Sequence, residues 1–98
     1  MSDDFFAPPP FNAASSVERI RRALREKRTL TERGAARFDW RGQPAVEIAV
    51  DGAVIRARVA KHPMRSSDWQ LRTLSDGAMV RHWIEDTLRQ VERWSDED

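Results

Sequence analysis

The side chains most often used in catalysis are sparse in this chain. It has two histidines, His62 and His82, and no cysteine. The lack of cysteine excludes thiolate nucleophiles, thiol redox chemistry and cysteine-ligated zinc. His82 and Asp86 lie four residues apart, so on a helix they could offer two ligands to a metal ion. No HExxH or comparable spacing supplies a third ligand. We therefore expect no metal site and interpret this pair as exposed polar residues.

The remaining residues give little support for a nucleophilic active site or for a phosphate-binding loop. Ser66 and Ser67 follow His62 closely, but the three match no known nucleophile–base arrangement, and no GxSxG turn occurs. The chain has four glycines, which do not gather into a loop that would wrap a phosphate. The sequence therefore predicts a protein that is not an enzyme and needs no cofactor.

Arginine is the residue type that most favours recognition of another molecule. The chain has 15 arginines and two lysines, and the planar guanidinium binds phosphate or carboxylate through paired hydrogen bonds. Alanine is also abundant, so we attribute the count itself to GC-rich coding. Position is more informative, because alternation along the expected strands turns one set of arginines to solvent. This candidate partner surface comprises Arg37, Arg56, Arg58 and Arg72.

Two classes of partner fit such a surface. A nucleic acid would place phosphates on the arginines. However, Phe38 and Trp40 are expected to point into the core, which leaves no aromatic residue among the arginines for base stacking. The net charge is also only +1. We therefore expect a small non-catalytic protein-interaction module, an adaptor or regulator. Its partner is another protein or a second copy of the chain as a homodimer, and nucleic-acid binding is the alternative.

The elements that position these arginines are organised around residues 45–60. Two runs of alternating apolar residues are joined there by Asp51-Gly52. This is a strong hairpin signal, because a type I′ turn needs positive φ at both central residues. A turn at these two residues predicts three apolar cross-strand pairs, Val50–Ala53, Ile48–Ile55 and Val46–Ala57. Glu47 then lies opposite Arg56 on the other face.

The segments before the hairpin predict one helix and one strand. The helix begins at Ser15 or Ser16, since Ser15-x-x-Glu18 is a capping box, and ends between residues 28 and 33 with Gly34 as its cap. Residues 37–41 alternate as a strand with Phe38 and Trp40 inward. A three-residue loop, Arg41–Gln43, then sets Phe38 opposite Val46 on the apolar face.

The segments after the hairpin predict a further strand and a long helix. Residues 69–74 alternate with Trp69, Leu71 and Thr73 on one side. Ser75 or Asp76 caps the last helix, over residues 78–94. That helix carries an apolar stripe of Val80, Trp83, Ile84, Thr87, Val91 and Trp94.

Together these segments predict an α+β fold. An antiparallel meander of three to four strands around the Asp51-Gly52 hairpin is covered on one face by an N-terminal and a C-terminal helix, in the order α-β-β-β-(β)-α. We place the domain at residues 15–94, between an N-terminal tail over 1–14 and an acidic tail over 95–98.

The N-terminal tail carries a second candidate binding feature. Residues 8–10 are three consecutive prolines, which favour a polyproline II conformation. Phenylalanines flank them, and these are either docked on the domain or a ligand for a partner: Phe5, Phe6 and Phe11. The chain begins without a basic-then-apolar signal pattern and has no apolar run of about 20 residues. We therefore expect a cytoplasmic protein with no membrane partner.

Overall fold

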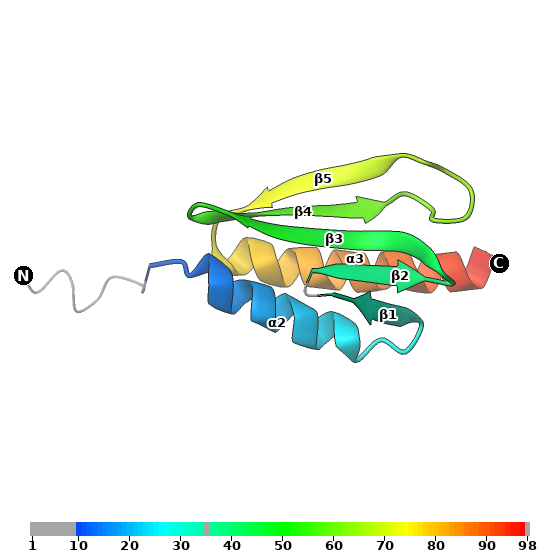
Figure 1. Ribbon diagram of the computed structural model, residues 1–98, viewed down its shortest axis with the longest axis horizontal. Helices are drawn as coiled ribbons and strands as arrows, with labels where there is room; N and C mark the ends of the chain where they lie inside the picture. Colours follow the sequence, from blue (N-terminus) through cyan, green and yellow to red (C-terminus); the bar gives the residue numbers. More distant parts are fainter. Residues whose placement is uncertain (1–9, 35, 98) are drawn as a thin grey trace, which may run out of the picture.

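The computed structural model of the chain describes residues 10–34 and 36–97 (Figure 1). The elements follow one another as α2 (Ala13–Arg25), β1 (Leu30–Arg33), β2 (Arg37–Trp40), β3 (Gln43–Asp51), β4 (Val54–Ala60), β5 (Trp69–Leu74) and α3 (Gly77–Glu97). The predicted α+β class is confirmed. The sheet has five antiparallel strands rather than three or four, so the order is α-β-β-β-β-β-α.

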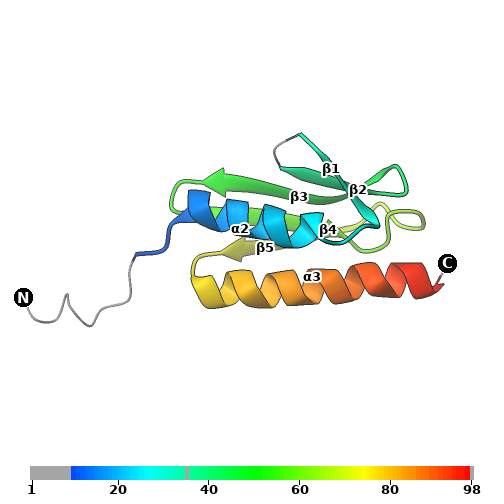
Figure 2. The same cartoon turned by 90° about the horizontal axis from the view of Figure 1, so that it is seen from below.

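The molecule has two layers. The strands pair strictly in chain order, β1 to β5, with every neighbouring pair antiparallel. Both helices lie side by side on the same face of this sheet (Figure 2). Their apolar stripes and the inner face of the sheet enclose one core, whose largest fully buried side chains are Trp40, Trp94, Phe38, Ile20, Leu24 and Ile55. Burial of these side chains is the main stabilising contribution.

Strand β1 is an element that the sequence analysis missed. The helix predicted to continue to residues 28–33 ends at Arg25, and Leu30–Arg33 then pairs with β2. Gly34 has a φ of +65° in the turn between these strands, so it serves a hairpin and does not cap the helix. Leu30 is buried in the core that the sheet forms with the helices. Two β-branched threonines flank it and disfavour the helical alternative.

The start of α2 differs from the predicted capping box. Asn12 is the N-cap, and its side-chain oxygen accepts the backbone N–H of Ser15 at 3.0 Å. The helix therefore begins at Ala13, inside the segment assigned to the tail. Phe11, just before the cap, is partly buried and packs against the core. Docking is thus the correct interpretation for Phe11, whereas Phe5 and Phe6 lie outside the described residues.

The central hairpin forms, but its turn is shifted by one residue. Asp51 pairs with Val54, so the two turn residues are Gly52 and Ala53. Gly52 has a φ of +61°, and Ala53 is not among the positive-φ residues. This is the pattern of a type II′ turn, with glycine at the first central position. The observed pairs are Val50–Ile55, Ile48–Ala57 and Val46–Val59, and Glu47 faces Arg58 instead of Arg56.

The loop between β2 and β3 is also shorter than predicted. Trp40 pairs with Gln43, so the turn consists of Arg41 and Gly42, both with positive φ (51° and 82°). A bulge between Phe38 and Asp39 then shifts the register by one residue. Phe38 consequently lies opposite Val46, as predicted, although a two-residue loop alone would have set it on the other face.

Helix α3 matches the predicted stripe, and all six stripe residues are buried. Asp76 caps it by accepting the backbone N–H of Met79 at 2.8 Å. Near its C-terminal end, the indole N–H of Trp94 donates to the carbonyl of Lys61 at 3.0 Å, which fixes the helix to the end of β4. In the part of the chain described, neither helix is long and apolar enough to cross a membrane.

Candidate functional site

The sheet face that points away from α2 and α3 carries no covering element within residues 10–34 and 36–97 (Figure 2). We call it the open face. Strand alternation sends every second side chain onto it, and the sheet is hollowed there into a concavity of about 540 Å³. Residues lining this concavity include Arg33, Ala36, Arg37, Glu47, Ala49, Arg56, Arg58, Leu71 and Thr73.

The arginines of the open face are held by carboxylates of the same face. Arg58 donates from Nε (3.1 Å) and Nη2 (2.7 Å) to one carboxylate oxygen of Glu47. Arg33 and Arg37 both approach the carboxylate of Asp39, at 3.3 Å and 3.5 Å. The Asp39 side chain is almost completely buried beneath these two guanidiniums. An acid that is buried in this way requires its cationic partners.

Charge on the open face is therefore nearly balanced. Arg56 forms an ion pair with Asp51 at the hairpin end. The four arginines are thus matched by three carboxylates, those of Asp39, Glu47 and Asp51. The concavity also has accessible apolar surface, because Ala49 is exposed in its middle and Leu71 is 72 % exposed at its margin on β5.

Of the four arginines in the predicted surface, three lie on the open face and one does not. The structure brings Arg37, Arg56 and Arg58 together. Arg72 borders the concavity, but it pairs with the core residue Ala57, so its side chain leaves β5 on the helix side of the sheet. The assignment of Arg72 to the open face is therefore wrong.

The error for Arg72 arises because β5 faces the opposite way from the prediction. Trp69, Leu71 and Thr73 lie on the open face, while Leu74 is the residue of β5 that is fully buried in the core. As a result, one aromatic side chain does lie among the arginines. The guanidinium of Arg58 stacks over the Trp69 ring at 4.4 Å, a cation–π contact. The expectation that the open face lacks an aromatic residue is thus also wrong.

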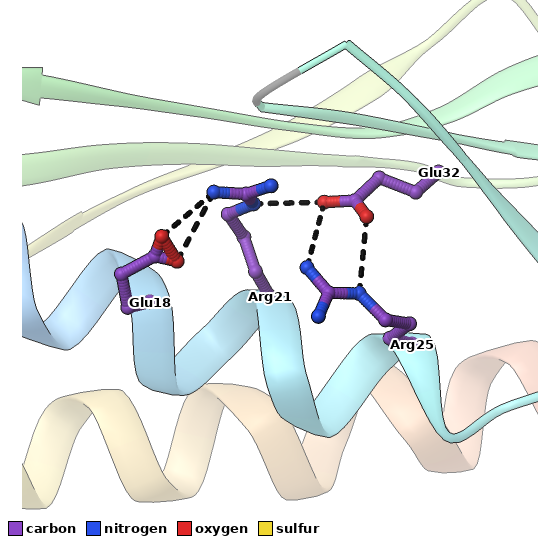
Figure 3. A network of polar contacts seen from close by, with 4 residues as sticks. All are labelled: Glu18, Arg21, Arg25 and Glu32. Atoms are coloured by element: carbon purple, nitrogen blue, oxygen red, sulfur yellow. Dashed lines mark hydrogen bonds and ion pairs between the residues drawn. The ribbon is translucent and has the colours of Figure 1, made fainter.

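The basic helix α2 uses part of its charge to hold β1. Arg21 donates to Glu18 (2.7 Å and 3.0 Å) and to Glu32 (2.7 Å), and Arg25 donates to both oxygens of Glu32 (Figure 3). Hydrogen bonds from Arg21, and then from Arg25, hold the pKa of the Glu32 carboxyl below its usual value. These two arginines of α2 are committed to the fold and are not free to bind a ligand.

The two histidines occupy contrasting positions. His62 is buried, with its ring edge-on to Trp40 and close to Trp94, and its Nδ1 accepts the backbone N–H of Met64 at 3.2 Å. His82 is exposed on α3. Within the described residues, no group of three histidine or acidic side chains is arranged to hold a metal ion.

Comparison with known protein families, with curated proteins and with solved structures found no significant match to this chain. The interpretation of the open face therefore rests on its own geometry and charge.

Proposed function

We propose that this chain is a cytoplasmic, non-catalytic protein-interaction module that binds a protein partner in the concavity of the open face. The positions of its reactive side chains support the absence of catalysis. His62 is buried and packs against the rings of Trp40 and Trp94. The carboxylate of Asp86, which could have joined His82, instead forms an ion pair with Arg89.

One observation carries the proposal: the concavity has accessible apolar surface and a charge-matched rim. Accessible apolar surface, as at Leu71, gains free energy when a partner excludes water from it. Arginine, which lines the concavity, and tryptophan, which contacts Arg58 on the same face, are residue types enriched where proteins bind one another. Because each arginine already has a carboxylate partner, the rim favours a surface with both signs of charge.

Nucleic-acid binding is the second candidate, and the contact between Arg58 and Trp69 is what favours it, since aromatic and guanidinium planes both stack on bases. Three carboxylates on the same face weigh against it. A phosphate backbone that lies across the arginines would also meet Glu47, Asp39 and Asp51, and like charges repel. The favoured partner is therefore a protein, either another chain or a second copy of this one.

A matched pair of alanine-to-arginine variants separates the candidates. Ala49→Arg fills the middle of the concavity and adds a positive charge, whereas Ala14→Arg makes the same change on the exposed side of α2. In affinity purification from the native host, we expect a protein that is recovered with the wild type and with Ala14→Arg and is lost with Ala49→Arg. The loss follows because a long side chain would occupy the space of the partner.

If the open face binds nucleic acid, Ala49→Arg should increase binding, because an added arginine on this face would strengthen phosphate binding. Recovery of more nucleic acid with Ala49→Arg than with the wild type would contradict the proposal. Recovery of the same proteins by all three forms would contradict it as well.

A further inference from the structure

Strand β5 forms one edge of the sheet, and its outer backbone groups are available to a partner. The backbone N–H of Lys61 donates to the carbonyl of Asp68 at 2.9 Å. With the register of β4 and β5, this bond shows which residues of β5 direct their backbone groups toward β4. In an antiparallel pair, alternate residues direct both backbone groups to the neighbouring strand. Gln70, Arg72 and Leu74 therefore bond to β4. The N–H and C=O groups of Trp69, Leu71 and Thr73 point outward from the edge.

This edge lacks several of the devices that usually block strand addition, although it has one charged residue, Arg72, on its helix side. Its six residues include no proline and no lysine, and they pair with β4 without a bulge. Edge strands normally carry such features to prevent pairing with another chain. Leu71, in the middle of the edge, is 72 % exposed. The backbone of strand β5 is thus open to a further strand that can match the charge of Arg72.

A groove of about 630 Å³ runs between this edge and α3. Four cationic side chains line it, Lys61, Arg72, Arg89 and Arg93, with a single carboxylate, that of Asp86. Asp86 pairs with Arg89. The other three cations form no ion pair with any residue in 10–34 or 36–97. In contrast to the open face, the groove holds a positive charge that no ion pair within the described part of the chain neutralises.

We propose that the β5 edge binds an extended, acidic segment of a partner protein as a sixth strand. Main-chain hydrogen bonds to Trp69, Leu71 and Thr73 would supply the affinity of strand addition. Side chains of an added strand alternate between the two faces. Those on the helix side meet the cations of the groove and should be acidic. Those on the other side meet Leu71 and should be apolar.

The chemistry of the edge favours a peptide over the other occupants. A strand edge alternates donors and acceptors, which an extended peptide matches group for group, whereas a phosphate backbone offers acceptors and would leave the carbonyls unpaired. A second copy of the chain would bring two equally cationic grooves together, and like charges would oppose that pairing. The groove borders the concavity of the proposed function and shares Leu71 with it, but the two tests change different residues. Of the two sites, Ala49 lines only the concavity and Arg93 lines only the groove, so either proposal can fail without the other.

The test uses the whole chain and two fluorescent hexapeptides of identical composition. In one, glutamate and valine alternate; in the other, three glutamates precede three valines. The alternating peptide should bind about ten-fold more tightly, since it alone can place every acid on the groove side. Arg72→Gln and Arg93→Gln should each weaken its binding about five-fold, the size of one partly exposed ion pair. Arg22→Gln, at an exposed position of α2, is the matched control and should leave it unchanged.

Two further measurements report on the edge itself. The bound alternating peptide should slow hydrogen exchange at the amides of Trp69, Leu71 and Thr73, which point outward. Leu71→Pro removes one outward N–H and no bond to β4, and proline is tolerated at such edge positions. It should abolish binding, with circular dichroism confirming that the fold is kept.

Three results would overturn the inference. Equal affinities for the two peptides would show that charge alone attracts them. Protection of the three amides in the free protein, rising with protein concentration, would assign the edge to a second copy. A single-stranded oligonucleotide that displaces the peptide and binds more tightly than it would assign the groove to nucleic acid.

Discussion

Replacing Ile55 with alanine should remove a large share of the stability of this domain. Ile55 is fully buried on the inner face of the sheet, where it pairs with Val50 on β3 and with Leu74 on β5. The change deletes the three carbons beyond Cβ. At about 0.8 kcal/mol per buried carbon, the lost transfer free energy is about 2.4 kcal/mol. A cavity that the neighbours do not refill adds about 1 kcal/mol or more.

The free energy of unfolding should therefore fall by about 3–4 kcal/mol, and its total is roughly 5–15 kcal/mol for a typical domain. Urea denaturation followed by tryptophan fluorescence measures it, because Trp40, Trp83 and Trp94 are buried. With a slope near 1.5 kcal/mol per molar urea, the midpoint should fall by about 2 M at unchanged slope.

Val50→Ala is the matched control. Val50 lies directly opposite Ile55 but is 50 % exposed near the hairpin turn, so the same kind of truncation should cost less than about 1 kcal/mol. Equal midpoints for the two variants, or an Ile55→Ala midpoint within about 0.3 M of the wild type, would refute the assignment of Ile55 to the core.

Three other predictions concern single positions. Gly52→Val should lower the melting temperature by several degrees, because a β-branched residue resists the φ of +61° at that turn. Trp83→Ala should lower the free energy of unfolding by about 3–5 kcal/mol, because Trp83 is buried. The adjacent His82→Ala should leave it almost unchanged, because His82 is exposed. Micromolar zinc binding that is lost in His82→Ala would contradict this interpretation of His82. Hydrogen bonds, chiefly from Arg21, lower the pKa of the Glu32 carboxyl in the folded state. The ionised carboxylate therefore stabilises the fold fully above the ordinary carboxyl pKa, and this stabilisation is lost as the pH falls through the lowered pKa. Glu32→Gln should therefore reduce stability at neutral pH and flatten the acid branch of a stability–pH profile.

The hairpin and α3 could be predicted because their signals are local. A glycine turn between alternating runs and a stripe of helical period both act within a few residues of sequence. The register was wrong by two residues because Gly52 fits either the second position of a type I′ turn or the first position of a type II′ turn. A shift of two preserves the side-chain period of a strand, so the faces of Ile48 and Ile55 were correct although their partners were not.

The alternation of β5 could not show which set of its side chains faces the core. Trp69 and Leu71 look like core residues by polarity, yet they lie on the open face because the buried end of the strand is set by Leu74. A strand that turns its larger apolar residues to solvent breaks the usual pattern. Such conflicts concentrate at functional sites. β1 escaped prediction because Leu30 is its only apolar residue, so its sequence, LTER, shows no alternation, unlike that of β2.

Site-specific crosslinking tests the central claim most directly, that the open face binds a protein. Benzoylphenylalanine in place of Ala36 puts a photoreactive ring on the lining of the concavity without removing an ion pair, and the same group in place of Arg22 puts it on the exposed side of α2. After irradiation in cells, the chain should yield a discrete adduct from position 36 and not from position 22. That adduct should be insensitive to nuclease and destroyed by protease. An adduct that shrinks on nuclease treatment, or identical adducts from both positions, would contradict the assignment.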